Sequence, residues 1–287
     1  MKDMRVINSM DDVMKINDII DEVWAEAVRE VKWPPDGVER SEKKKEIAMK
    51  YQLPHEENKR IFKEQIILSL FGGKEKSEKP KILITGGLPG VGKTAALIPM
   101  LQRRNPNAIL AQVGELALNH TDRDRIKKEH PSEFEEATLM DAYIWLNAVN
   151  GLALRSGNDL ILERTLRSLP QSVVDDNTRN GYETEFHVLT ASDTEVRFRL
   201  FEKYIEGLKR EGESGRLTDI DFFEEVLAKM PATMRELERN GNSICVYKCG
   251  NKELGKEPEE PELVYPIERN THISFSYGDY VIHYEGR

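Results

Sequence analysis

The sequence predicts an α/β fold in which a mostly parallel sheet is flanked by helices, with a helical extension before it and a β-hairpin after it. Two observations lead to this prediction. Short apolar runs of strand length recur along the middle of the chain, and segments long enough for helices separate them, as in sheets with helical crossovers. The predicted strands are residues 82–85, 108–113, 159–162, 185–189 and 243–247.

The helical extension occupies the first part of the chain. Apolar residues recur at helical intervals from Ser9 to Val31, and Ser9 with the acid three residues later matches a capping box. Turn-forming residues at 33–37 end this helix. Further helices are expected at residues 41–51 and 54–71, and we place the end of the extension after residue 53.

The last part of the chain is predicted to be an acidic linker and a β-hairpin. Residues 255–262 are rich in Glu and Pro, which is typical of a solvated linker. Alternating apolar residues then flank a Gly-Asp turn, which predicts a hairpin of residues 273–277 and 280–284. We therefore expect three parts: the extension (1–53), an α/β domain (54–250) and the linker with its hairpin (251–287).

Composition and charge exclude several classes of protein. The 287 residues suffice for one large domain with an appendage. No apolar run approaches the roughly 20 residues that span a bilayer, and the first residues lack the apolar core of a secretory signal, so we expect a cytoplasmic protein without a membrane partner. The formal net charge of −9 argues against a nucleic-acid partner. Both cysteines, Cys245 and Cys249, are expected to be reduced thiols.

A phosphate-binding loop is predicted directly after the first strand. Residues 87–94 match the pattern G-x-x-x-x-G-K-[ST], and a helix is expected from Ala95 onward. Glycines let successive backbone N–H groups point at phosphate oxygens, while Lys93 reaches the β- and γ-phosphates and Thr94 supplies a hydroxyl for Mg²⁺. The predicted nucleotide-binding residues are Gly87, Leu88, Pro89, Gly90, Val91, Gly92, Lys93, Thr94 and Ala95.

Two carboxylates, Asp122 and Asp124, follow the second predicted strand, a region that faces the phosphates in kinases with such a loop. A carboxylate there can accept the proton of a substrate hydroxyl as the hydroxyl attacks the γ-phosphate. The same acids also suit the N-terminus of a helix, where they interact favourably with the helix dipole. The residues alone leave both interpretations open.

The segment around Asp124 resembles the D-x-D-x-x-[RK]-x-x-H-P signature of the zeta toxin family, since Lys127, His130 and Pro131 match as well. Residues 160–167 are similar to the apolar strand and the E-G-T-x-R motif of that family. These similarities imply a P-loop kinase fold.

A third similarity lies further along the chain. Residues 201–204 resemble the E-R-Y segment of the family, Arg216 matches its second arginine, and residues 230–233 match a downstream L-P motif. The resemblance covers about residues 57–250.

The resemblance implies a bacterial toxin of a toxin–antitoxin system. Such toxins use ATP or GTP with Mg²⁺ to phosphorylate the 3′-hydroxyl of UDP-N-acetylglucosamine. On this basis Asp124 is expected to be the general base, and the cations Lys93, Lys203 and Arg216 are expected to stabilise the transferring phosphoryl group. The implied acceptor-binding residues are Asn147, Glu163, Thr165 and Arg167.

The chain departs from the family pattern at three positions. Lys203 replaces an arginine, so a point charge stands in for a planar, bidentate group. Asn147 replaces a glutamate and Arg164 a glycine, and both changes fall on the acceptor side. UDP-N-acetylglucosamine is the expected acceptor, and another nucleotide or dinucleotide is the alternative. A nucleotide-binding regulator without catalytic activity is the second hypothesis.

The inhibitor of such a kinase is expected to be either a separate antitoxin or the chain's own N-terminal helices. Antitoxins of the family are helical proteins that obstruct the nucleotide site, so the helix from Ser9 to Val31 could do the same in cis. The alternative is that this helix only buries its apolar face on the rest of the protein.

Overall fold

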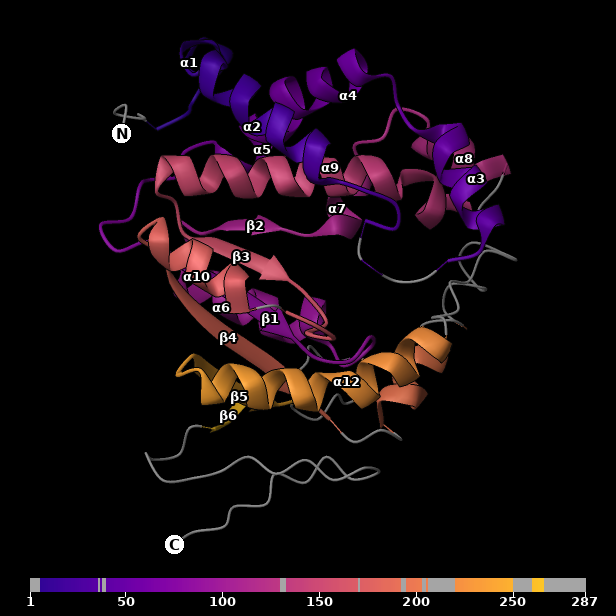
Figure 1. Cartoon of the computed structure of the whole chain (residues 1–287), viewed down its shortest axis with the longest axis vertical. Coiled ribbons are helices and arrows are strands. Elements are labelled where there is room, and N and C mark those ends of the chain that lie inside the picture. The colour runs from indigo at the N-terminus through magenta and orange to yellow at the C-terminus, as the bar shows by residue number, and fades with distance from the viewer. Residues whose placement is uncertain are drawn as a thin grey trace, which may run out of the picture. The chain divides into compact units, whose positions relative to one another are not determined.

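The chain divides into two compact units, residues 1–80 with 107–160 and residues 81–106 with 161–287 (Figure 1). The predicted hairpin and most of the acidic linker lie outside the residues that this computed structural model describes. The predicted end of the extension, after residue 53, falls inside the first unit and stays a prediction. The described residues are 6–35, 37, 40–129, 133–169, 171–191, 195–202, 205, 220–249 and 260–265.

The first unit consists of helices around one long helix, α9 (Phe134–Ser156). This helix is apolar on most sides and largely buried, as expected for a helix surrounded by others. Helices α2, α3 and α7 pack against it. The other elements of this unit are α1 (Met10–Lys15), α2 (Asn17–Glu30), α3 (Glu42–Tyr51), α4 (His55–Ile61), η1 (Phe62–Ile66), α5 (Ile67–Phe71), β2 (Ile109–Ala111), α7 (Val113–Ala117) and α8 (Arg123–Glu129).

The first predicted helix forms with one interruption. The Ser9 Oγ accepts a hydrogen bond from the Asp12 N–H at 3.3 Å, so the predicted cap is confirmed. The backbone leaves helical geometry at Ile16, which divides the predicted helix into α1 and α2. Helix α2 packs against α9, and in Figure 1 it lies obliquely across α9. The buried face of α2 consists of Ile20, Val23, Trp24 and Ala27.

This packing confirms that the helix buries its apolar face. Full burial of one large apolar side chain contributes about 1.5–3 kcal/mol, so the contact between α2 and α9 stabilises the first unit substantially. Inhibition in cis by the same helix stays a prediction.

The second unit contains a mostly parallel sheet with the strand order β3-β1-β4-β5-β6. Strand β4 pairs in parallel with both β1 and β5, and the register aligns the core residues Ile84, Phe186 and Ile244. Helices η2, α6, α10 and α12 complete this unit, so the predicted α/β class is confirmed. Its elements are β1 (Lys81–Gly86), η2 (Lys93–Leu97), α6 (Ile98–Arg104), β3 (Leu160–Glu163), α10 (Gln171–Arg179), β4 (Glu183–Thr190), α12 (Ile220–Arg239), β5 (Ser243–Lys248) and β6 (Glu262–Tyr265).

Strand β6 was not predicted from the sequence. It pairs antiparallel with β5, and Val246 lies opposite Tyr265. The Glu-Pro composition that indicates a linker therefore extends into the beginning of a strand at Glu262. Pairing with β6 satisfies backbone groups that β5 would otherwise expose along its edge.

A charged network joins β1, β4 and β5. The Glu185 carboxylate contacts the ammonium group of Lys81 and lies 3.3 Å from the His187 Nε2. The other ring nitrogen of His187 lies 3.1 Å from the Tyr247 hydroxyl. The hydrogen bond from His187, followed by that from Lys81, lowers the pKa of Glu185 to about 2, while burial raises the pKa of Tyr247 to about 12.

Replacing Glu185 by glutamine is expected to lower stability at neutral pH, because the substitution removes the charge that Lys81 and His187 stabilise. The folded-state pKa of about 2 lies below the ordinary value of 4.5. The stabilisation is therefore fully present above pH 4.5 and is lost as the pH falls toward 2. Urea unfolding at several pH values measures the difference between wild type and variant.

The matched control is Glu183→Gln, since Glu183 is more exposed and lies 3.5 Å from the Lys81 ammonium group. Its effect on stability is expected to be small. A Glu185→Gln deficit that is as large at pH 3 as at pH 7 would contradict the assignment.

Candidate functional site

The predicted phosphate loop lies between β1 and η2, so the strand–loop–helix context is confirmed. Three of its glycines have positive φ: 132° at Gly87, 81° at Gly90 and 107° at Gly92. Residues with a side chain rarely adopt these conformations. The curl of the loop therefore depends on glycine at these positions.

The loop is also packed too closely for side chains at two of these glycines. A Cβ atom on Gly87 would lie 2.5 Å from the carbonyl oxygen of Leu189, at the end of β4. A Cβ atom on Gly90 would lie 2.5 Å from the Leu200 side chain. The end of β4 and the segment 195–202 thus support the loop from outside.

Lys93 lies inside the curve of the loop. Its ammonium group donates hydrogen bonds to the carbonyl oxygens of Gly87 at 3.0 Å and Leu88 at 3.1 Å, and the residue is 7% exposed. Thr94, the next residue, is exposed in the first turn of η2. A concentrated positive charge beside curled backbone N–H groups suits a polyphosphate.

Substituting Gly90 by alanine tests the loop geometry. We expect a loss of about 1–3 kcal/mol in stability, because the left-handed backbone strains a residue that carries a Cβ atom. Weaker nucleotide binding is expected to accompany this loss. The control is Gly114→Ala on α7, where a Cβ atom would meet nothing within 4 Å. Chemical unfolding and a fluorescent ATP analogue measure both effects, and equal behaviour of the two variants would contradict the role of Gly90 in the loop geometry.

The acidic segment belongs to the first unit. Asp124 lies in the first turn of α8 with its side chain 86% exposed, 3.4 Å from the guanidinium group of Arg123. The Asp122 carboxylate accepts a hydrogen bond from Arg125 at 2.8 Å. Asp124 is therefore the more accessible of the two carboxylates. The remaining signature residues, His130 and Pro131, lie outside the described residues.

The predicted acceptor segment follows β3 in the second unit. Glu163 ends the strand, and the Arg164 N–H donates to the carbonyl oxygen of Thr85 at 3.1 Å, which keeps the segment beside β1. Leu166 has a positive φ of 55°, and its side chain packs against Gly86, where a Cβ atom would lie 2.3 Å from it. The first residues after β3 are thus held against the strand that precedes the phosphate loop.

Arg167 is occupied by a contact that the sequence did not predict. Its guanidinium group donates to both carboxylate oxygens of Glu225 on α12, at 2.8 and 2.9 Å. The Thr233 hydroxyl donates to the Arg167 carbonyl oxygen at 3.1 Å. The Glu225 carboxylate therefore neutralises the charge of Arg167, a residue that is expected from the family resemblance to bind the acceptor.

Asn147 is half-buried on α9 in the first unit, and Thr165 is half-buried after β3 in the second. Lys203 and Arg216 lie outside the described residues. The second unit therefore brings together the phosphate loop and the segment from Glu163 to Arg167, while Asp124 and Asn147 belong to the first unit.

Sequence reasoning missed Arg199. Its guanidinium group donates to the carbonyl oxygen of Val91 in the phosphate loop at 2.8 Å and lies 3.0 Å from the Cys249 Sγ. Glu195, one helical turn earlier, pairs with the same group. The available signal was the spacing of Arg199 four residues before Lys203, a spacing that predicts two cations on one face of a helix.

Metal-binding clusters and membrane-spanning helices are both absent from the described residues. Within the described ranges, no group of three or more His, Cys, Asp or Glu side chains could hold a metal ion. In that part of the chain, no helix is long and apolar enough to cross a membrane. The exposed hydroxyl of Thr94 beside Lys93 fits Mg²⁺ carried by a nucleotide, since Mg²⁺ needs few protein ligands when phosphates supply the others.

Comparisons with known proteins agree with the motif analysis. The family model described as "Zeta toxin" matches residues 69–257. "Toxin zeta" from Streptococcus pyogenes and "Toxin zeta" from Enterococcus hirae are each 21% identical over 198 residues, covering 68% of this chain and 69% of theirs. A solved structure from the PezAT chromosomal toxin–antitoxin system of Streptococcus pneumoniae matches with a TM-score of 0.59 and 18% identity, covering 69% of this chain and 78% of that one.

Proposed function

The chain belongs to the zeta toxin family of kinase-like toxins, and we propose that it transfers the γ-phosphate of ATP or GTP to a hydroxyl of a nucleotide sugar. The proposed acceptor is the 3′-hydroxyl of UDP-N-acetylglucosamine. The observation that carries the proposal is the position of Lys93 inside a loop curled by glycines at positive φ.

The phosphate loop holds the nucleotide in this proposal. Backbone N–H groups of residues 87–94 contact phosphate oxygens, and Lys93 neutralises the charge on the β- and γ-phosphates. Thr94 would hold Mg²⁺ through its hydroxyl, and the metal would supply positive charge to the phosphates. The side-chain cations Lys203 and Arg216 add to the stabilisation of the transferring group, in the roles that the resemblance implies.

Asp124 serves as the general base. Its carboxylate is 86% exposed, so an acceptor hydroxyl can reach it, whereas Asp122 is paired with Arg125 at 2.8 Å. Proton transfer to a positioned carboxylate contributes about 10²–10⁴-fold to such reactions. The proposed reaction therefore depends strongly on where Asp124 is held.

In this proposal the acceptor is bound by Asn147, Glu163, Thr165 and Arg167. Because Glu225 already pairs with Arg167, an anionic acceptor group must compete with that carboxylate for the guanidinium group. Asn147 and Arg164 make this side less acidic than the family pattern. Both features are also compatible with another nucleotide or a dinucleotide as the acceptor.

An inhibitory partner is part of the proposal. The solved structure with a TM-score of 0.59 comes from a toxin–antitoxin system, which supports a protein antitoxin for this chain as well. The N-terminal helices are the alternative inhibitor. The cytoplasm is the proposed location, because nucleotides and nucleotide sugars are available there.

Asp124→Asn is expected to retain nucleotide binding and to lose about 10²–10⁴-fold in acceptor phosphorylation, since only the proton acceptor is removed. The control is Glu129→Gln, an exposed carboxylate at the end of the same helix, which is expected to keep full activity. The assay incubates protein, ATP, Mg²⁺ and UDP-N-acetylglucosamine and detects the phosphorylated sugar nucleotide by mass. Unchanged turnover in Asp124→Asn would exclude the role.

A non-catalytic nucleotide-binding regulator is the second candidate function, favoured by the pairing of Arg167 with Glu225. Incubation with ATP, Mg²⁺ and a metabolite extract separates the two. A new phosphorylated mass that requires Lys93 supports the kinase and identifies its acceptor. Nucleotide binding without any new phosphorylated mass supports the regulator.

A further inference from the structure

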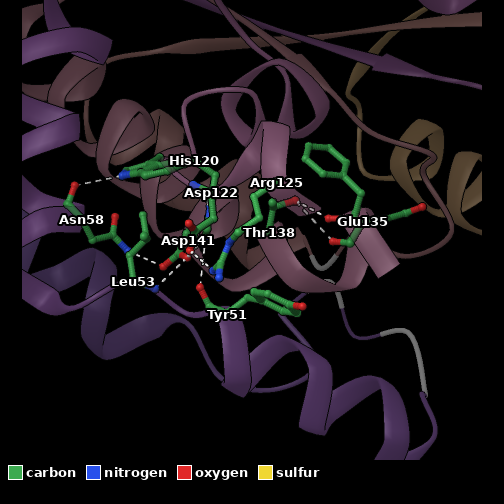
Figure 2. Close-up of polar contacts among 11 residues, drawn as sticks. Tyr51, Leu53, Asn58, His120, Asp122, Arg125, Glu135, Thr138 and Asp141 are labelled. Atoms are coloured by element: carbon green, nitrogen blue, oxygen red, sulfur yellow. Dashed lines mark hydrogen bonds and ion pairs between the residues drawn. The ribbon is translucent and has the colours of Figure 1, made fainter. Parts of the chain in front are cut away.

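The imidazole of His120 links three segments of the first unit (Figure 2). Its Nδ1 lies 3.1 Å from the backbone N–H of Asp122, and its Nε2 lies 3.1 Å from the carbonyl oxygen of Tyr51. The same Nε2 lies 3.4 Å from the Asp141 carboxylate. Because an N–H can only donate, Nδ1 must accept and Nε2 must carry the proton. The whole residue is 1% exposed.

Asp141 fixes the other side of this ring. Its carboxylate is fully buried on α9 and accepts hydrogen bonds from the Leu53 N–H at 3.1 Å and from the Asn58 side-chain amide. Burial raises the pKa of Asp141, and hydrogen bonds from His120 and Leu53 oppose that rise. A buried carboxylate is costly unless donors surround it, so these contacts hold the three segments together.

Helix α8 is attached to the same region at a second point. Ile126 is buried in an apolar cluster with Tyr51 and Ala137. The Ile126 N–H also donates to the Asp122 carbonyl oxygen at 2.9 Å. Asp124 lies between these attachments, so its backbone position is defined even though its side chain is exposed.

The backbone N–H of Asp122 is bonded to the imidazole and not to the Asp122 side chain. Its carboxylate contacts Arg125, and the N–H finds its acceptor in the Nδ1 of His120. This hydrogen bond is part-buried, so loss of the acceptor is expected to cost a fraction of the roughly 1–3 kcal/mol of a fully buried unsatisfied N–H. The imidazole therefore helps to stabilise the turn that leads into α8.

We propose that His120 is a positioning residue for Asp124, held in its tautomer and orientation by Asp141 and by the Tyr51 carbonyl. This inference rests on the proposed kinase function, in which Asp124 accepts the acceptor's proton. It gives Tyr51, Leu53 and Asn58, near the junction of α3 and α4, a supporting role in the reaction. That role differs from the inhibitory one suggested by the family's antitoxins.

Two substitutions in the full chain separate the two hydrogen bonds of His120. Asparagine places an acceptor oxygen near the position of Nδ1, whereas glutamine places its amide near Nε2 and leaves the Asp122 N–H without an acceptor. His120→Gln is expected to lower kcat by about 10- to 100-fold, the scale that misplacement of a reacting group produces. His120→Asn is expected to lose at most a few-fold. Equal losses in the two variants would overturn the proposal.

The controls separate positioning from unfolding. KM for ATP is expected to be unchanged in both variants, because Lys93 and its loop belong to the other unit. His55→Gln makes the same substitution in the first unit, at a residue whose ring contacts Trp24 on α2, and is expected to keep kcat. A loss of kcat in this control as large as that in His120→Gln would overturn the assignment to His120.

A measurement on the wild-type chain needs neither a variant nor activity. Nitrogen NMR of the His120 ring is expected to show the tautomer with the proton on Nε2 and an unprotonated, hydrogen-bonded Nδ1. A proton on Nδ1 would overturn the inference. Wild-type protein without acceptor phosphorylation would instead reject the proposed function, so the two failures are distinguishable.

Discussion

The buried carboxylate of Asp141 imposes the main constraint on the first unit. An ionised group without contact to solvent costs several kcal/mol unless donors converge on it. The donors come from Leu53, Asn58 and His120, which lie on separate segments. Long helix α9 therefore holds the α3–α4 junction and the turn before α8 by polar contacts as well as by apolar packing. The Trp145 indole adds a bond to the Asn58 carbonyl oxygen at 3.1 Å, one turn further along α9.

The second unit depends on a different constraint, the backbone geometry of the phosphate loop. Positive φ angles at its glycines curl the loop around Lys93. Leu189, Leu200 and Arg199 contact the loop from outside. A protein with a net charge of −9 can bind a polyphosphate in this way, because cations and N–H groups concentrate positive potential locally. The acidic surface elsewhere does not prevent it.

Local signals in the sequence predicted the features that depend on neighbouring residues. The Ser9 cap involves residues three apart, and the strand–loop–helix context of Lys93 is continuous in the chain. The His120 site could not be predicted, since its partners Tyr51 and Asp141 are distant in the sequence and meet only through folding. The pairing of Arg167 with Glu225 has the same cause.

Other differences between prediction and structure also have physical reasons. Strand β6 was hidden by a Glu-Pro composition that a strand at the sheet edge tolerates. Arg199 was missed because its contact with Val91 joins residues far apart in the chain. The roles of Lys203 and Arg216 stay predictions, since both lie outside the described residues.

Amide hydrogen exchange in an Asp141→Ala variant tests most directly whether the buried carboxylate organises the segment that carries Asp124. Exchange reports the opening of individual hydrogen bonds. The account predicts faster exchange at the Leu53 N–H, which donates to Asp141, and also at the Asp122 N–H, which is linked to Asp141 through His120. Faster exchange at Leu53 with unchanged exchange at Asp122 would contradict it.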